Sequence, residues 1–221
     1  MTKTPKITRE CVKQLLETKY IRVYDLQYEE GRHYYDVSRR PMDRLIAVKN
    51  AEEFRSVYAD AVTCIVIIET ENEEPRLLLS YEFRYPAGRY LLSPPAGLID
   101  PDDGIGEEAL LHTARREIRE ETGIVIRDTD SVRVVNPLVF STPGMSDESN
   151  ALVCAVIRAK DLSELSQDGA EETEHFDGFA LLTREEARKV LADGCDANRI
   201  PYSVYTWAAL VWFVSDLWKA E

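Results

Sequence analysis

Three glutamates near the middle of the chain have the spacing of a metal site. Glu117, Glu120 and Glu121 occupy positions i, i+3 and i+4 of a predicted helix. Their side chains therefore lie on one side of that helix, where like charges cost roughly a few tenths of a kcal/mol per pair. A helix with such repulsion is either an ordinary solvated acidic surface or holds a cation, and carboxylate oxygens suit Mg²⁺ or Mn²⁺.

The residues around these glutamates form a longer pattern. Arg116 precedes Glu117, and Gly123 ends the helix because glycine readily takes the left-handed conformation. With its flanks, the stretch resembles the Nudix box, G-x5-E-x7-R-E-U-x-E-E-x-G-U, where U is a bulky apolar residue. Glu108 and the residues after it match position by position. Ten residues, not five, separate Gly97 from Glu108, as if PDDGI were inserted in the loop.

The resemblance implies a role for each matched residue. Glu117 and Glu121 would be the main ligands of Mg²⁺ or Mn²⁺, with Glu120 as a further ligand and the Ala96 carbonyl joining them from the loop. Arg116, Glu108, Gly97 and Gly123 would be structural. In particular, Arg116 would pair with Glu108 and hold the loop against the helix.

Two flanking segments resemble the ADP-ribose pyrophosphatases within this family. One is FRYPAGRYLLSPPAGLID, where Arg84 is the candidate diphosphate ligand because a guanidinium matches phosphate oxygens. The other is STPGMSDE, where Glu148 is a candidate substrate contact. The alternatives are a surface ion pair for Arg84 and a solvated side chain for Glu148. Ser93-Pro94 stands where many of these enzymes have a glutamate.

The acidic segment AEETEHF, residues 170–176, corresponds to a loop that supplies a glutamate in these enzymes. That glutamate acts as the base or as an additional metal ligand. Glu172 and Glu174 are the candidates, Glu171 is a rival, and solvated loop residues are the alternative. Glu120 completes the expected catalytic set.

The activity implied is metal-dependent hydrolysis of a nucleoside diphosphate linked to another moiety. For ADP-ribose the products would be AMP and ribose 5-phosphate. The alternatives are a pyrophosphatase for another sugar nucleotide and a non-catalytic nucleotide sensor with the same fold. A sensor of this kind usually lacks one or more of the box carboxylates, whereas all three are present here.

Composition narrows the partners and the location. The 221 residues include 27 Lys and Arg against 40 Asp and Glu, a formal net charge of −13. Such an acidic chain argues against a nucleic-acid partner, which requires a basic surface. The apolar segment 202–217 is shorter than the roughly 20 residues of a membrane span. Without a C-x-x-C motif or a signal-peptide pattern, we expect a cytoplasmic protein with reduced cysteines.

The remaining segments predict an α+β fold. We expect helices over 8–16 and 106–122, a third after Thr183 and an apolar one after Pro201, and strands over 20–28, 33–38, 44–49, 61–69, 76–85, 89–93, 131–140, 151–159 and 177–182. Residues 1–58 would be a helix and a β-rich dimerisation extension. Residues 59–221 would form a Nudix domain, a mixed β-sheet between helices. By resemblance, the extension would help to build a homodimer. Its tyrosines could stack on a nucleotide base, and the alternative is packing in the core or at the dimer interface.

Overall fold

The computed structural model describes residues 4–71, 73–171 and 173–219. The chain divides into two compact units. We call Met1–Asp60 with Leu138–Asn150 the N-terminal unit, and Ala61–Pro137 with Ala151–Glu221 the sheet unit. Within the described ranges, none of the helices is both long enough and apolar enough to cross a membrane.

The N-terminal unit is built on a three-stranded antiparallel sheet. Its strands are β1 (Val12–Glu17), β2 (Arg22–Glu29) and β3 (Arg32–Ser38), in the order β1-β2-β3. Gly31 takes a positive φ of 72° in the turn between β2 and β3, which pair as an antiparallel hairpin. Tyr24 and Leu45 are fully buried in the small core of this unit.

Two expectations for the N-terminal unit are wrong. Residues 8–16 are not an α-helix: a 3₁₀ turn, η1 (Arg9–Cys11), leads directly into β1. Pairing of β1 with β2 outweighs the helical pattern of this segment, because tertiary context routinely overrides local propensity. Residues 44–49 form a second 3₁₀ turn, η2 (Ile46–Val48), instead of a strand.

The sheet unit contains the larger, seven-stranded sheet. The path β10-β5-β4-β9-β8 is extended by β6 beside β5 and by β7 beside β4. The strands are β4 (Ala61–Glu69), β5 (Arg76–Arg84), β6 (Arg89–Ser93), β7 (Ala96–Leu98), β8 (Ser131–Phe140), β9 (Ser149–Arg158) and β10 (Phe176–Leu182). The short 3₁₀ turns are η3 (Tyr85–Ala87), η4 (Pro101–Asp103) and η5 (Leu217–Lys219).

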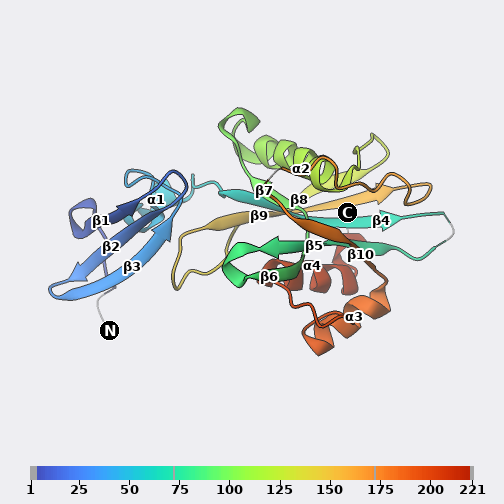
Figure 1. Cartoon of the computed structure of the whole chain (residues 1–221). Coiled ribbons are helices and arrows are strands. Elements are labelled where there is room, and N and C mark those ends of the chain that lie inside the picture. Colours follow the sequence, from blue (N-terminus) through green and yellow to red (C-terminus); the bar gives the residue numbers. More distant parts are fainter. Residues whose placement is uncertain (1–3, 72, 172, 220–221) are drawn as a thin grey trace. The chain divides into compact units, whose positions relative to one another are not determined.

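Helices cover both faces of this sheet. The helix α2 (Gly106–Thr122) lies on one side, and α3 (Arg184–Asp193) and α4 (Val204–Val214) lie on the other (Figure 1). The first eight residues of β4 are buried, as its continuous apolar sequence predicts for a strand covered on both faces. The predicted α+β fold is confirmed.

Side-chain caps fix the ends of several helices. Asn50 forms a capping box with Glu53 at α1 (Ala51–Phe54), and Thr183 forms one with Glu186 at α3. At the C-terminal end of α2, Gly123 has a φ of 75°, and its N–H donates to the Arg119 carbonyl at 2.9 Å. The end of the carboxylate-bearing helix is therefore set by local chemistry.

Candidate active site

The helix α2 turns two of the three box glutamates into the protein. Glu117 and Glu121 are 6% and 3% exposed, whereas the side chain of Glu120 is 39% exposed. Glu117 and Glu121 are one helical turn apart, so the same face of α2 buries both. A solvated acidic surface therefore describes neither of these two carboxylates.

The backbone at Ala96 and Gly97 forms the wall against which these carboxylates pack. The Ala96 N–H donates to Glu121 Oε1 at 2.9 Å. At Gly97 a side chain would be impossible without movement, because a Cβ there would lie 1.9 Å from Glu117 Oε1. Antiparallel pairing of β7 with β4 fixes this backbone, since Ala96 pairs with Thr63. Glycine at position 97 thus makes room for the Glu117 carboxylate.

Burial and mutual repulsion raise the pKa values of both carboxyls. The pKa of Glu117 rises to about 7, first through burial and then through repulsion by Glu120 and Glu174, with Arg116 acting in the opposite direction. The pKa of Glu121 lies well above its usual value, again chiefly through burial. An added positive charge would favour the ionised forms, so this donor set fits a divalent cation that prefers oxygen.

Arg116 is the positively charged group next to two of the three box glutamates, Glu117 and Glu120. Its Nη1 lies 2.7 Å from Glu117 Oε1 and 3.2 Å from Glu120 Oε2, so it stands between the two groups. Across the described residues, no group of three or more His, Cys, Asp or Glu side chains is arranged as a metal-binding cluster. In this arrangement Glu117 and Glu120 share a guanidinium.

The expected pair between Arg116 and Glu108 is replaced by a different contact. Glu108 is exposed in the first turn of α2, and the ion pairs found among the described residues do not include it. Arg116 Nη2 instead donates to the Leu98 carbonyl at 3.0 Å and to Asp103 Oδ2 at 3.4 Å. Asp103 belongs to the inserted residues of the loop, so the insertion provides the acid that braces Arg116.

Asp103 is fixed from several sides. Its carboxylate accepts a hydrogen bond from Thr113 at 2.9 Å, lies 2.6 Å from His112 Nδ1 and accepts from the Asp100 N–H at 2.8 Å. Burial alone would raise its pKa, but these bonds and Arg116 outweigh burial and lower the pKa to about 2. His112, to which the sequence assigned no role, therefore helps to hold the loop.

The acidic loop brings one of its candidate glutamates to the carboxylates. The Phe83 N–H donates to the His175 carbonyl at 2.8 Å, which holds this loop beside the end of β5. Glu174 is close enough to Glu117 and Glu121 to raise the pKa values of both. Burial in turn raises the pKa of Glu174. Glu172 lies outside the described residues.

A rival from the same loop, Glu171, is exposed. Its N–H donates to the Glu174 carboxylate at 3.1 Å, so it holds Glu174 through the backbone. Among the described glutamates of this loop, Glu174 is the one that the structure places with the box carboxylates.

Sequence reasoning missed Glu82. This residue of β5 has a side chain only 12% exposed, and its Oε2 lies 2.7 Å from Arg84 Nη2. Its charge acts on Glu121 and on Glu174. The available signal was a single acidic residue in the apolar strand RLLLSYEFR, two positions before Arg84.

Glu148 lies in the N-terminal unit, where it has a partner of its own. Its Oε1 accepts a hydrogen bond from Arg39 Nε at 2.9 Å, and both side chains are about one third exposed. Ser146 Oγ accepts from the Glu148 N–H at 2.9 Å, which fixes the backbone of the STPGMSDE loop. Glu148 is therefore ion-paired in the structure, and so is Arg84, whose partner is Glu82.

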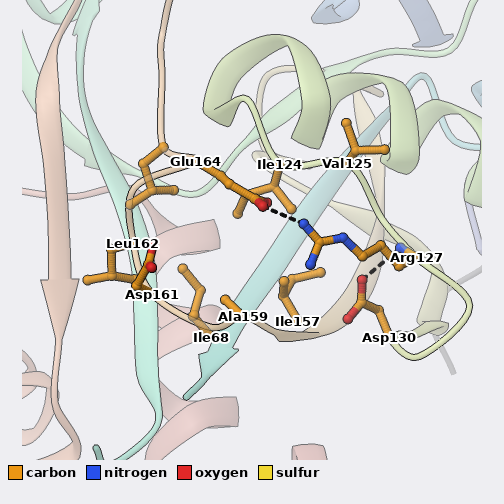
Figure 2. A pocket seen from close by; sticks show the side chains of 11 residues that line it. Ile68, Ile124, Val125, Arg127, Asp130, Ile157, Ala159, Asp161, Leu162 and Glu164 are labelled. Carbon is orange, nitrogen blue, oxygen red and sulfur yellow. Dashed lines mark hydrogen bonds and ion pairs between the residues drawn. The ribbon is translucent and has the colours of Figure 1, made fainter. Parts of the chain in front are cut away.

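Figure 2 shows a separate, small pocket next to the end of α2. Apolar side chains such as Ile68, Ile124 and Ile157 line it, and an ion pair between Arg127 and Glu164 lies at its edge. None of the predicted site residues is among its lining residues. This pocket therefore belongs to the packing after the helix and not to the carboxylates.

Comparison with known proteins gives the family. A family model described as NUDIX domain matches residues 57–202. The chain is 35% identical to the ADP-sugar pyrophosphatase of Mus musculus over 103 residues, 47% of this chain and 43% of that protein. It is 32% identical to the ADP-ribose pyrophosphatase of Saccharomyces cerevisiae over 95 residues, 42% of this chain and 37% of that protein. The chain thus spans less than half the length of these two relatives.

The fold has a solved counterpart. A crystal structure described as an ADP compounds hydrolase superposes with a TM-score of 0.55 and 17% identity, covering 98% of this chain and 94% of that one. Because the family model covers well over half of the sequence, the chain belongs to the NUDIX family. The predicted family and its mixed sheet between helices are confirmed.

Proposed function

We propose that this NUDIX protein hydrolyses the diphosphate of a nucleoside diphosphate linked to another moiety, with ADP-ribose as substrate and AMP and ribose 5-phosphate as products. The observation that carries the proposal is the burial of Glu117 and Glu121 together against the backbone of Ala96 and Gly97. The relatives named ADP-sugar and ADP-ribose pyrophosphatase support the choice of substrate.

Glu117, Glu120, Glu121 and the Ala96 carbonyl would hold Mg²⁺ or Mn²⁺. When bound, such ions neutralise phosphate oxygens and lower the pKa of a coordinated water. Arg116 has further partners in the Leu98 carbonyl and Asp103, so it stays anchored when the carboxylates turn to a cation. The loop is then held in place in either state.

Glu174 is the proposed base. Its raised pKa brings a carboxylate closer to neutral pH, where a base takes a proton most effectively. Glu172 remains an alternative base from the same loop. Glu120 completes the proposed catalytic set, and of the three box glutamates it has the most exposed side chain. If Glu174 is the base, Glu174→Gln will lower kcat by about 10²-fold or more, whereas Glu171→Gln will not.

Arg84 is the proposed diphosphate ligand, and its side chain is 46% exposed at the end of β5. Its guanidinium would pair with the negative charge of the diphosphate, which the carboxylates on their own would repel. Glu148 is proposed as a further substrate contact, with Arg39 as its partner in the free protein.

We also propose that residues 1–58 serve dimerisation and that residues 59–221 form the catalytic domain of a cytoplasmic homodimer. The N-terminal unit leaves large apolar side chains exposed, including Leu15 and Leu16 of β1 at 49% each and Tyr20, between β1 and β2, at 65%. Burial of such a surface in a second copy would stabilise a dimer. All four cysteines are free, in keeping with a reducing compartment. Light scattering should give twice the chain mass, and Leu16→Glu should shift it toward the monomer.

The deciding experiment is product identification with a substrate panel. Dinucleotides, sugar nucleotides and nucleoside triphosphates are incubated with the protein and Mg²⁺, and AMP release from ADP-ribose is expected. Glu121→Gln should abolish it, while Glu107→Gln, on the exposed first turn of α2, should not. Faster turnover of another sugar nucleotide would correct the substrate. Binding by calorimetry without any turnover would favour a nucleotide sensor.

A further inference from the structure

Glu82 and Arg84 form a close ion pair at the end of β5. They stand two residues apart on one strand, so their side chains leave from the same face of the sheet. Glu82 Oε2 and Arg84 Nη2 are 2.7 Å apart. Glu82 is the more buried partner, with its side chain 12% exposed, and Arg84 is the more exposed partner, at 46%. The pair therefore reaches from the interior to solvent.

The inner end of this pair is held in place. Ser93, on the neighbouring strand β6, is 2% exposed and lies close enough to the Glu82 carboxyl to lower its pKa. Ser93 pairs with Ser80, which makes it the diagonal neighbour of Glu82 on the same face. A largely buried carboxylate on a paired strand gives Arg84 a point of attachment on the sheet.

The surroundings of Glu82 are unfavourable for a negative charge. Glu174 repels it, and Glu82 in turn raises the pKa of Glu121. Arg84 is the positive group that offsets this repulsion. Exposed ion pairs contribute little to stability, and a buried carboxylate among others costs free energy. A contribution to stability therefore does not account for Glu82 at this position.

We propose that Glu82 is a positioning residue that orients the Arg84 guanidinium toward the diphosphate of the substrate. This inference rests on the proposed function of Arg84. A guanidinium carries five N–H donors in a planar fork, and Glu82 contacts it through one terminal nitrogen. Among the described residues no other side chain forms an ion pair with this guanidinium, so its remaining N–H groups can donate to phosphate oxygens. Ordering the long side chain beforehand removes a cost that binding would otherwise carry.

The test is a double-mutant cycle on the full chain. Glu82→Ala, Arg84→Ala and the double variant are compared by kcat and KM for ADP-ribose. We expect each single change to raise KM about tenfold with kcat within about twofold, and the double variant to match Arg84→Ala. Simple electrostatics predicts the opposite sign, because removing a carboxylate should help an anionic substrate to bind. A lower KM in Glu82→Ala would therefore overturn the proposal.

Two further comparisons complete the experiment. Glu73→Ala removes the partner of Arg76 in an exposed ion pair before the same strand, and it should leave KM unchanged. Glu82→Gln keeps an oxygen that accepts from Arg84 and should restore part of the affinity. Additive effects in the cycle, or a loss in kcat together with a higher Mg²⁺ requirement, would place Glu82 in the carboxylate centre instead.

A readout independent of turnover separates this inference from the proposed function. The ¹⁵N relaxation of Arg84 Nε reports how ordered its side chain is in the free protein. We expect an ordered side chain in the wild type and a mobile one in Glu82→Ala. Equal mobility in both would refute the positioning role even if the protein hydrolyses ADP-ribose. A clear difference would uphold the ordering of Arg84 even if the substrate is another diphosphate.

Discussion

Gly97→Ala should separate the chemistry of this protein from its stability. A Cβ at position 97 would lie 1.9 Å from Glu117 Oε1 and 2.0 Å from its Cδ, whereas ordinary contacts begin near 3.4 Å. The carboxylate must therefore move by about 1.5 Å, the difference between 3.4 and 1.9 Å. Because it is the end of a flexible side chain, it can move without displacing the backbone.

The consequences for activity and for stability differ. Displacing a catalytic group by about 1 Å can cost on the order of 10²-fold in rate, so we expect kcat for ADP-ribose to fall at least that far. The affinity for Mn²⁺, measured by calorimetry, should fall as well. Alanine restricts the unfolded chain more than glycine does, by roughly 0.4–1 kcal/mol, which offsets part of the crowding. The urea midpoint should therefore change little.

Gly144→Ala is the matched control, since the nearest atom to its Cβ would be Tyr34 Oη at 3.9 Å. It should leave kcat and the affinity for Mn²⁺ unchanged. Wild-type kcat in Gly97→Ala would refute the idea that Glu117 must lie against this backbone. A large loss of stability in the same variant would show that the backbone, and not the side chain, gives way.

Three other variants address stability. Gly123→Ala should lower the free energy of unfolding by more than about 1 kcal/mol in urea titrations, because φ is 75° and the new Cβ would meet the Glu164 carbonyl oxygen at 2.7 Å. Burial, then repulsion by a neighbouring carboxylate, raises the pKa of Asp36 from 3.8 to about 6, so the folded state binds this proton more tightly. Stability should then fall as pH rises from about 4 to 6, by up to about 3 kcal/mol, and Asp36→Asn should be the more stable protein at pH 8 but not at pH 4. The pKa of Asp103 is lowered to about 2, so its ionised form stabilises the fold above pH 4 and this contribution is lost as the pH falls toward 2. Asp103→Ala should cost about 2 kcal/mol at pH 7 in thermal melts, and the exposed Asp102→Ala almost nothing.

The features that could be predicted from sequence are those determined by neighbouring residues. The helix over 106–122 has the predicted bounds because its turns repeat one apolar face and Gly123 can adopt the conformation that ends it. The capping box at Thr183 depends only on Glu186, three residues away. The hairpin of β2 and β3 depends on the turn at Glu30 and Gly31, where Gly31 takes a positive φ.

The features that could not be predicted depend on contacts between distant segments. Residues 12–17 have a helix-like pattern, yet they form β1 because β2 offers a partner edge. Glu82 gains its importance from Glu174, which is distant in sequence, and from Ser93 on the next strand. No pattern within one segment contains that information.

The enlarged loop shows why a motif position and a structural role can separate. The box pattern assigns the partner of Arg116 to Glu108, but the inserted residues bring Asp103 into its reach. Asp103 points to Arg116, His112 and Thr113, all on α2. The inserted acid thus braces the loop and adds no free carboxylate to the centre. On this reasoning, the insertion bears on how the loop is anchored. The residues that select the substrate of the proposed hydrolase are to be sought at Arg84 and in the acidic loop.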